Sequence, residues 1–264
     1  KAVANERVPD TDVAVQVRQG LHGDHVEANL PLKQAYQCRI TGPAAEADKI
    51  PGIDRLRFLT SHPKFFSDKL IDTIAALPSV CEHVNLPVQA GDNEVLRRMR
   101  RTYTAEHYRD RIARIRATIP GVTVSTDIIV GFPGETDEQF ANTLELLRDI
   151  DFDKVHVAMY SPRPGTLSAR WEDDIPHDVK HARHQAIERL QEEVSARKYR
   201  ALVGETREVL IDGFAKGRWR GRTRGNQLVF FDAPGDWLGQ TVEVEITQST
   251  TWYLLGQPLA LVAR

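Results

Sequence analysis

The sequence has only two cysteines among its 264 residues, Cys38 and Cys81. Two thiols are too few for a disulfide framework or for a metal cluster held by cysteines, and this scarcity is typical of a reducing compartment. We therefore expect a cytoplasmic protein with no metal site in this chain. No apolar run approaches the roughly 18 residues that span a membrane, and no signal-peptide pattern opens the chain, so we expect no membrane partner.

An excess of charge of one sign is also missing, as are several common catalytic motifs. The formal net charge is −2, so a nucleic-acid site would have to come from local clustering of basic residues. The sequence has no nucleophile, base and acid pattern, no Walker loop and no dinucleotide-binding glycine fingerprint. Its composition, 41% hydrophobic and 27% charged, is ordinary for a chain that buries a sizeable core.

The clearest local pattern is a strand, a glycine turn and a helix within residues 122–140. A β-branched apolar run ends at a turn that contains Gly131 and Gly134, and Thr136 with Gln139 then has the spacing of a capping box. The loop after a parallel strand is a frequent ligand site, because backbone N–H groups point there. The two glycines would let a flat or anionic ligand approach the backbone. The alternative is a well-formed turn without a ligand.

Other segments repeat this strand and helix texture. Apolar runs predict strands, and capping residues followed by helical apolar spacing predict helices. Residues 1–20 carry only a weak helical pattern, through Val13, Val17 and Leu21. The repeated units predict an α/β fold with a parallel sheet, curved into a full or partial barrel with one functional rim. The expected strands are 56–59, 83–88, 122–130 and 154–160, and the expected helices begin at Ser67, Asp92, Thr104 and Thr136, with a long polar helix over 178–203.

Polar side chains lie at or near the carboxyl ends of these strands. Around an apolar floor that includes Ile129 and Phe132, they suit a ligand with a ribose, a carboxylate and a planar base. Each of them alone could instead cap a loop, and only their number favours a binding site. They are Ser61, His62, Gln89, Thr126, Asp127, Tyr160, Ser161 and Arg163.

The sequence after Gly204 changes to short strands and turns, which predict a small all-β barrel. Val242, Val244 and Ile246 alternate with polar residues, as in a half-buried antiparallel strand. Basic residues at every second position would share one side of an extended strand and form a cationic stripe for RNA, with aromatic rings available to stack on bases. A solvated strand face and an aromatic barrel core are the alternative. The expected RNA-binding residues are Lys216, Arg218, Trp219, Arg220, Arg222 and Arg224, and an arginine-rich run over 97–116 could extend the stripe.

Four long motifs in this chain resemble a known family in order and spacing. FLTSHPKFFSDKLIDTIA, HVNLPVQAGDNEVLRRMRRTYT, STDIIVGFPGETDEQF and HVAMYSPRPGT are similar to the second half of the radical S-adenosylmethionine (SAM) barrel of the methylthiotransferases. The tail from Tyr199, with GRWRGRTRGNQLVFF, resembles their RNA-binding TRAM domain. The resemblance favours the branch that methylthiolates isopentenyladenosine beside the anticodon of tRNA. The branches that act on threonylcarbamoyladenosine in tRNA or on a ribosomal protein fit less well.

The resemblance implies SAM and two four-iron four-sulfur clusters as cofactors, and the anticodon stem-loop of tRNA as partner of a monomer. It also implies that SAM is cleaved reductively to a radical that abstracts hydrogen from adenine, before sulfur insertion and methylation. Gln89 matches the strand that meets the SAM ribose, Ile129 the strand beside its adenine, and Tyr160 with Ser161 the last strand of the site.

The chain departs from the family pattern at its N-terminal end. It has no Cys-x-x-x-Cys-x-x-Cys loop, and residues 21–49 lack the expected strand with a Gly-Gln-Asn end. We therefore expect neither cluster in this chain, and we interpret it as a partial or frame-disrupted product, inactive alone. The predicted division is an unassigned remnant over 1–49, the C-terminal part of a radical SAM core over 50–198 and a TRAM domain over 199–264. A non-catalytic RNA-binding module is the rival interpretation.

Overall fold

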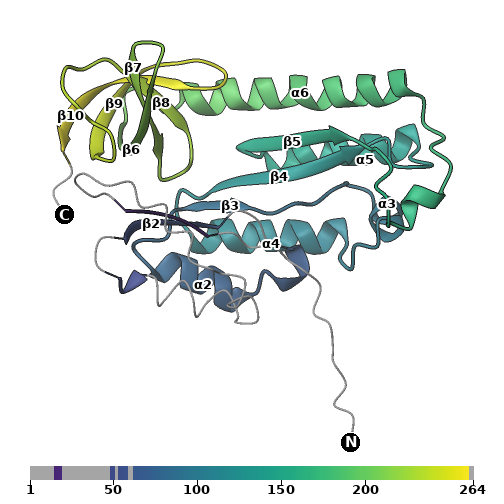
Figure 1. The fold of residues 1–264 in the computed structure, drawn as a ribbon. Coiled ribbons are helices and arrows are strands. Elements are labelled where there is room, and N and C mark those ends of the chain that lie inside the picture. The colour runs from purple at the N-terminus through teal and green to yellow at the C-terminus, as the bar shows by residue number, and fades with distance from the viewer. Residues whose placement is uncertain (1–14, 20–47, 51–52, 59–61, 262–264) are drawn as a thin grey trace, which may run out of the picture.

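The computed structural model describes residues 15–19, 48–50, 53–58 and 62–261, and consists of an α/β unit and a small β-barrel (Figure 1). The long helix α6 (His177–Arg200) runs from the α/β unit to the barrel, which occupies the upper left of Figure 1. None of the helices in these described ranges is long and apolar enough to cross a membrane.

The centre of the α/β unit is a parallel sheet in the order β3 (His83–Asn85), β4 (Thr123–Val130) and β5 (Lys154–Met159). A parallel bridge from Leu56 to Val80 brings β2 (Ile53–Phe58) alongside this sheet, and β1 (Val15–Gln19) pairs with β2 in antiparallel orientation. The predicted parallel sheet is therefore confirmed. It remains open among the residues that the structure describes, as expected of a partial barrel.

Side-chain caps begin the four predicted helices of the α/β unit. The oxygens of Ser67, Asp92, Thr104 and Thr136 accept hydrogen bonds from backbone N–H groups in the first turns, and Thr136 with Gln139 forms the complete capping box. All four predicted starts are confirmed. The helices are α2 (Asp68–Ala76), α3 (Asn93–Arg98), α4 (Ala105–Thr118) and α5 (Asp137–Ile150), and short 3₁₀ turns lie at Pro63–Phe65 and Ser168–Arg170.

Strand β4 has two different faces. Val124, Thr126 and Ile128 are buried, and the Thr126 hydroxyl lies 3.4 Å from the phenol oxygen of Tyr108 on α4. This face therefore packs against the helices. The alternate residues of β4 face the opposite side of the sheet, where the structure has two cavities. Whether a side chain of β4 can meet a ligand thus depends on which of the two faces it points to.

Two expectations about strands were wrong. The weak helical pattern over residues 1–20 falls partly outside the described residues, and the described part is strand β1, because Val13, Val15 and Val17 also alternate with period two. The strand expected at 83–88 ends at Asn85. Pro87 has no N–H to donate, and the N–H of Val88 bonds to the Thr126 hydroxyl instead of a ladder carbonyl.

The C-terminal strands close into a barrel, as predicted, and the structure gives their order as β10, β8, β7, β6, β9. Val242, Val244 and Ile246 are fully buried, which confirms the alternating strand. Helix α6 ends at Arg200, three residues before the expected end, and Gly204 follows with φ +90°. The strands are β6 (Thr206–Ala215), β7 (Arg218–Thr223), β8 (Leu228–Phe231), β9 (Thr241–Ser249) and β10 (Leu254–Leu261).

Candidate cofactor pocket and nucleic-acid surface

A cavity of about 610 Å³ lies at the carboxyl ends of β4 and β5. Five of the seven residues predicted to bind the nucleoside cofactor line it, although they are up to 72 positions apart in the chain. These residues are Gln89, Asp127, Ile129, Tyr160 and Ser161. The structure therefore brings most of the predicted polar groups to one pocket of a size typical of small-ligand sites.

Of the other two predicted residues, the structure describes only one. Ser61 lies outside the described residues. Thr126 was wrongly predicted, because it is fully buried on the helix side of β4. Its hydroxyl donates to the carbonyl of Leu86 at 3.0 Å and accepts from the N–H of Val88 at 3.0 Å, so it braces the backbone after β3.

Gln89 is held in place by its backbone. Its N–H donates to the carbonyl of Asp127 at 2.9 Å, and its carbonyl accepts from the N–H of Ile129 at 2.9 Å. Its φ is +77°, a conformation that residues other than glycine rarely adopt and that clusters at binding sites. The bridge to β4 thus fixes Gln89 on the wall of the pocket beside Asp127 and Ile129.

Tyr160 lines the pocket and has a buried hydroxyl. Its ring packs edge-on against Phe132, with centroids 5.2 Å apart, and the ammonium of Lys180 lies 5.4 Å from its centroid. The phenol oxygen is buried and has no hydrogen-bond partner among the described residues. Because a buried hydroxyl without a partner costs free energy, a polar ligand atom at this position would stabilise the site.

Arginines make this pocket basic. Arg98, Arg100, Arg101 and Arg163 line it, and Asp127 is its one lining carboxylate. The sequence placed the first three in a possible RNA track, because nothing local showed that the turn after α3 returns to the strand ends. Guanidinium groups here are suitable partners for a ligand carboxylate.

The glycine turn after β4 does not offer its amides to a ligand. The N–H of Gly131 donates to a carboxylate oxygen of Glu135 at 2.7 Å, and the N–H of Gly134 donates to Asp174 at 2.6 Å. A Cβ at Gly131 would lie 2.3 Å from the side chain of Lys180. The expectation that a ligand approaches this backbone was therefore wrong. The glycines are needed for the close approach of the protein's own side chains.

The basic stripe of the barrel is shorter than predicted. Only Arg218, Arg220 and Arg222 lie on β7, because Lys216 turns the hairpin with φ +54°. Arg224 lies past the strand and bonds to Glu82 at 2.7 Å, which ties the barrel to the α/β unit. The prediction that all five basic residues share one strand face was therefore wrong for both ends of the stripe.

Acidic neighbours accompany the three arginines of β7. Arg218 lies 3.2 Å from Asp232, Arg220 lies 2.9 Å from Asp212, and Arg222 lies 3.7 Å from the same carboxylate. All three side chains are still exposed by more than 40%. They remain accessible to a polyanion, which would compete with two surface carboxylates.

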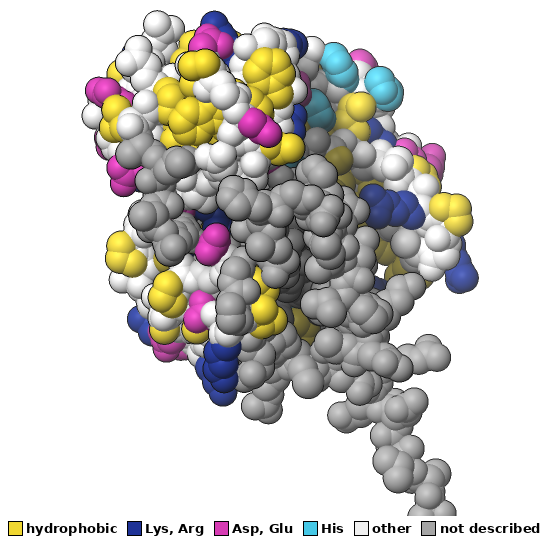
Figure 2. Space-filling view, turned by 60° about the vertical axis from the view of Figure 1, so that its left-hand side comes forward, with side chains coloured by type: hydrophobic (Ala, Val, Ile, Leu, Met, Phe, Trp, Pro, Cys, Tyr) yellow, Lys and Arg dark blue, Asp and Glu magenta, His cyan; other side chains and the backbone are white. Residues whose placement is uncertain are grey.

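The barrel aromatics divide into two groups. Trp219 and Trp237 pack against the barrel core, and the indole N–H of Trp219 donates to the carbonyl of Ala233 at 3.2 Å. Phe214, Trp252 and Tyr253 are exposed instead. Hydrophobic side chains gather over the barrel at the top of Figure 2, where rings can reach solvent and unpaired bases. The sequence left two alternatives, rings that stack on bases and an aromatic barrel core. The exposed rings suit the first, and Trp219 with Trp237 suits the second.

Half of the eight arginines in the run over 97–116 form ion pairs with acidic side chains. Arg97 pairs with Glu94, Arg109 with Asp149, Arg111 with Asp68 and Arg114 with Asp72. These pairs lie on the helical side of the α/β unit, so the geometry gives no continuous track from this run to β7.

Comparison with known proteins agrees with this geometry. The Radical SAM superfamily matches residues 29–147, and the TRAM domain family matches residues 200–259. The chain is 51% identical over 221 residues to a tRNA-2-methylthio-N(6)-dimethylallyladenosine synthase of Herpetosiphon aurantiacus, covering 81% of this chain and 50% of that protein. The chain belongs to the radical SAM methylthiotransferase family. Its radical SAM match begins within the segment that the sequence left unassigned.

Two further relatives bear the same name. The synthase of Chloroflexus aurantiacus is 51% identical over 215 residues, which cover 80% of this chain and 46% of that protein. The synthase of Dehalococcoides mccartyi strain CBDB1 is 46% identical over 252 residues, which cover 92% of this chain and 59% of that protein. The chain thus spans about half the length of the curated relatives it matches.

The residues present differ in how well they fit the two cofactors of the methylthiotransferase family. The residues that line the 610 Å³ pocket include a tyrosine, a carboxylate and guanidinium groups, which suit the polar groups of SAM. The described residues contain no group of three or more His, Cys, Asp or Glu that could hold a metal, and Cys81 is buried. They do not fit an iron-sulfur cluster. The expectation that this chain binds neither cluster stays a prediction.

Proposed function

We propose that this chain supplies the SAM pocket and the RNA-binding barrel of a tRNA methylthiotransferase that modifies isopentenyladenosine beside the anticodon. The observation that carries the proposal is the convergence of Gln89, Asp127 and Tyr160 on one pocket, in a chain that also carries a TRAM barrel. We assign residues 50–198 to the radical SAM core and 199–264 to the TRAM domain. We further propose a cytoplasmic monomer whose partner is the anticodon stem-loop.

Each group in the pocket has a distinct role in this proposal. Ile129 and Phe132 supply an apolar wall for the adenine, Gln89 and Asp127 hydrogen-bond the ribose, and an arginine of the pocket meets the carboxylate. Tyr160 and Ser161 close the site at the end of β5. When bound, SAM supplies the radical and the methyl group. The protein's own part is to orient the nucleoside and to exclude water.

Substitution of Tyr160 by phenylalanine separates binding from folding. Because the phenol oxygen has no partner in the described part of the chain, Tyr160→Phe should leave the free energy of unfolding unchanged or slightly higher. It should weaken SAM binding about tenfold, the usual effect of losing one good hydrogen bond. Titration calorimetry with SAM measures this change, and Tyr253→Phe on the exposed barrel surface is the control. No SAM binding by the unsubstituted chain, or equal affinity for Tyr160→Phe, would contradict the pocket assignment and favour a plain RNA-binding module.

The RNA surface is tested through the salt dependence of binding. The double variant Lys216→Gln/Arg218→Gln removes two cations at the end of the stripe that lies away from Glu82. The slope of log K against log salt for a single-stranded RNA should then fall by about 1.4, or roughly 0.7 per lost phosphate contact. The control is Lys69→Gln/Arg148→Gln, which removes two exposed cations from α2 and α5. If both double variants keep the original slope, this end of the stripe does not contact RNA.

A further inference from the structure

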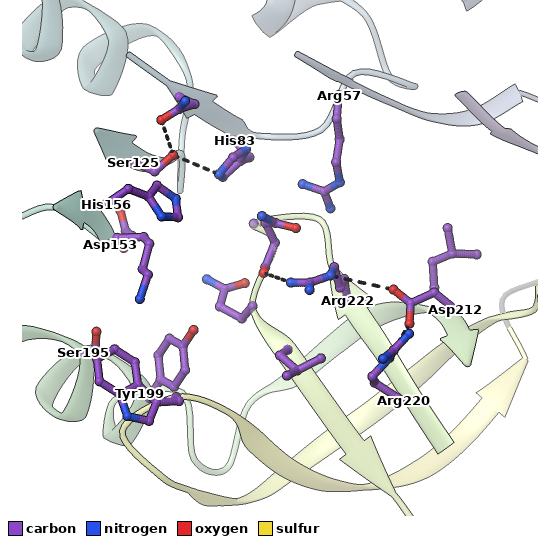
Figure 3. Close-up of a pocket in the computed structure, with 18 of the residues that line it drawn as sticks. Arg57, His83, Ser125, Asp153, His156, Ser195, Tyr199, Asp212, Arg220 and Arg222 are labelled. Atoms are coloured by element: carbon purple, nitrogen blue, oxygen red, sulfur yellow. Dashed lines mark hydrogen bonds and ion pairs between the residues drawn. The ribbon is translucent and has the colours of Figure 1, made fainter. Parts of the chain in front are cut away.

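A second and larger cavity lies between the α/β unit and the barrel, at the opposite end of β4 and β5 from the SAM pocket. Its volume is about 810 Å³. One wall consists of residues from the first halves of the parallel strands, among them His83, Ser125 and Lys154. The other wall belongs to β6, β7 and the turn after β7 (Figure 3).

Hydrogen bonds between the two units hold the walls of this cavity. Arg55 donates to the carbonyl of Arg222 at 2.7 Å and to the carboxylate of Glu208 at 2.8 Å. The Thr123 hydroxyl donates to the carbonyl of Gly225 at 2.8 Å, and Arg224 binds Glu82. Arg55 is 3% exposed, so its own contacts are largely shielded from water. The cavity is therefore held open by specific hydrogen bonds and ion pairs between the two units.

Cationic side chains outnumber anionic ones on the cavity walls. Five arginine or lysine residues line it against two carboxylates, Asp153 and Asp212, in a protein whose net charge is −2. Asp212 pairs with Arg220 and Asp153 pairs with Lys198 at 3.0 Å. Both carboxylates are thus already engaged by cations of the protein.

Arg57 and Lys154 differ from the other cavity cations, although burial lowers the pKa of Lys154 and the charge of Glu188 opposes that change. Neither forms an ion pair within the part of the chain that the structure describes. The Nη2 of Arg57 donates to the carbonyl of Thr223, whereas its Nη1 is buried and has no partner among the described residues. The Lys154 ammonium lies over the ring of Trp252, 4.4 Å from the centroid. Burial, together with Arg55 and Arg222, lowers the pKa of Arg57, which means that its charge is poorly compensated.

His83 adds a second unpartnered atom to this wall. The Ser125 hydroxyl donates to Asn85 at 2.9 Å, so its oxygen is free to accept from the Nε2–H of His83, 3.4 Å away. The Nδ1 of His83 is then the unprotonated nitrogen, and it is buried with no hydrogen-bond partner in the ranges that the structure describes. Burial, followed by the charges of Arg57, His156 and Arg222, lowers the pKa of His83 to about 4. An anion among these groups would reverse that repulsion.

We propose that this interdomain cavity binds a phosphate group, either of a free nucleotide or of an RNA backbone, through Arg57, Lys154 and Arg222. A phosphate offers several acceptor oxygens to guanidinium and ammonium donors and has the charge that the walls lack. Protonation of His83 at Nδ1 then adds a further donor. Free-nucleotide binding is independent of the proposed function, whereas the RNA source rests on it.

Proton NMR of the histidine rings tests the proposal on the whole chain. Inorganic phosphate, adenosine monophosphate and a single-stranded RNA are each added in turn. The signals of His83 and His156 should shift saturably, and the pKa of His83 should rise above its value without ligand. Lys154→Gln and Arg222→Gln should each weaken phosphate binding by about tenfold or more. Lys69→Gln, on the exposed side of α2, should bind as the unsubstituted chain does.

The three probes identify the source of the phosphate. Binding of the monophosphate without a response to RNA indicates a free nucleotide, and a tighter response to RNA indicates its backbone. No saturable shift with any probe, or equal affinity for Lys154→Gln, Arg222→Gln and Lys69→Gln, would overturn the proposal. Lys216 and Arg218 do not line the cavity, so Lys216→Gln/Arg218→Gln tests the RNA surface alone. A wrong assignment of the RNA surface would change the salt slope result, and a wrong assignment of the phosphate site would change the histidine signals.

Discussion

Replacement of Arg183 by methionine is expected to destabilise the protein by about 3–5 kcal/mol, because it leaves a buried carboxylate without its partner. Arg183 is 6% exposed and Glu135 is 1% exposed. Their charged groups are 2.9 Å apart, and Arg183 also donates to the carbonyl of Glu135 and to Asp137. Glu135 in turn accepts from the N–H of Gly131, so the loss would spread to the turn that carries Phe132.

Urea unfolding of Arg183→Met measures this loss, and Arg189→Met on the exposed side of α6 is the matched control. An exposed substitution of this kind should change the free energy of unfolding by less than about 0.5 kcal/mol. The double variant Arg183→Met/Glu135→Gln should recover much of the loss, because it removes the unpaired charge. A difference below about 1 kcal/mol between the two arginine variants would show that the buried pair is not a major source of stability.

The pH dependence of Arg183→Met provides an independent check. Burial raises the pKa of Glu135, and the hydrogen bond from Gly131 and the charge of Arg183 oppose that rise. Without Arg183 the folded-state pKa of Glu135 lies higher still. A raised carboxyl pKa means that the folded state gains stability as pH falls and loses it as pH rises. The defect of Arg183→Met should therefore shrink in acid.

His83 is expected to cost the protein about 3 kcal/mol of stability between pH 7 and pH 4, because each tenfold loss of proton affinity on folding corresponds to about 1.4 kcal/mol. Its pKa falls from an ordinary value of 6.5 to about 4 in the folded state, mainly through burial. Between these values the unfolded chain binds a proton that the folded chain does not. Stability is therefore lost as pH falls through this window and is present in full above it.

The variant His83→Gln isolates this effect, because an amide can donate to Ser125 but does not titrate. The difference in unfolding free energy between the original chain and His83→Gln should change by about 3 kcal/mol from pH 7 to pH 4. His107→Gln, on the exposed side of α4, is the control and should follow the original chain. Buffers without phosphate are required. Parallel curves for the original chain and His83→Gln would show that His83 does not stay neutral in the folded state.

The pocket at the strand ends illustrates how far local sequence patterns reach. Strand ends predicted Gln89, Asp127 and Tyr160 correctly as neighbours, because parallel strands deliver their carboxyl ends to one edge. The prediction placed the side chain of Thr126 on the wrong face of β4, since successive side chains of a strand point to opposite faces. A parallel strand is buried on both faces, so its apolar residues do not alternate and the sequence does not indicate which face meets the helices. Only the bond from Thr126 to the backbone after β3 decided its orientation.

The prediction of the basic stripe was wrong at both of its ends for a similar reason. A period of two describes charge along an extended strand, but nothing in that period indicates where the strand stops. Lys216 lies in the hairpin turn, and Arg224 bonds to Glu82, 142 positions away in the chain. A partner at that separation leaves no trace in the local pattern of charges.

The sequence by itself determined the elements of this protein: the caps at Ser67, Asp92, Thr104 and Thr136, the alternation in β9, and the family to which the whole belongs. Such features depend on neighbours within a few residues. The tertiary structure alone decided that the glycine-turn amides bond to Glu135 and Asp174, and that a cationic cavity lies between the units. Those outcomes depend on which distant side chains meet, and packing over the whole chain selects them.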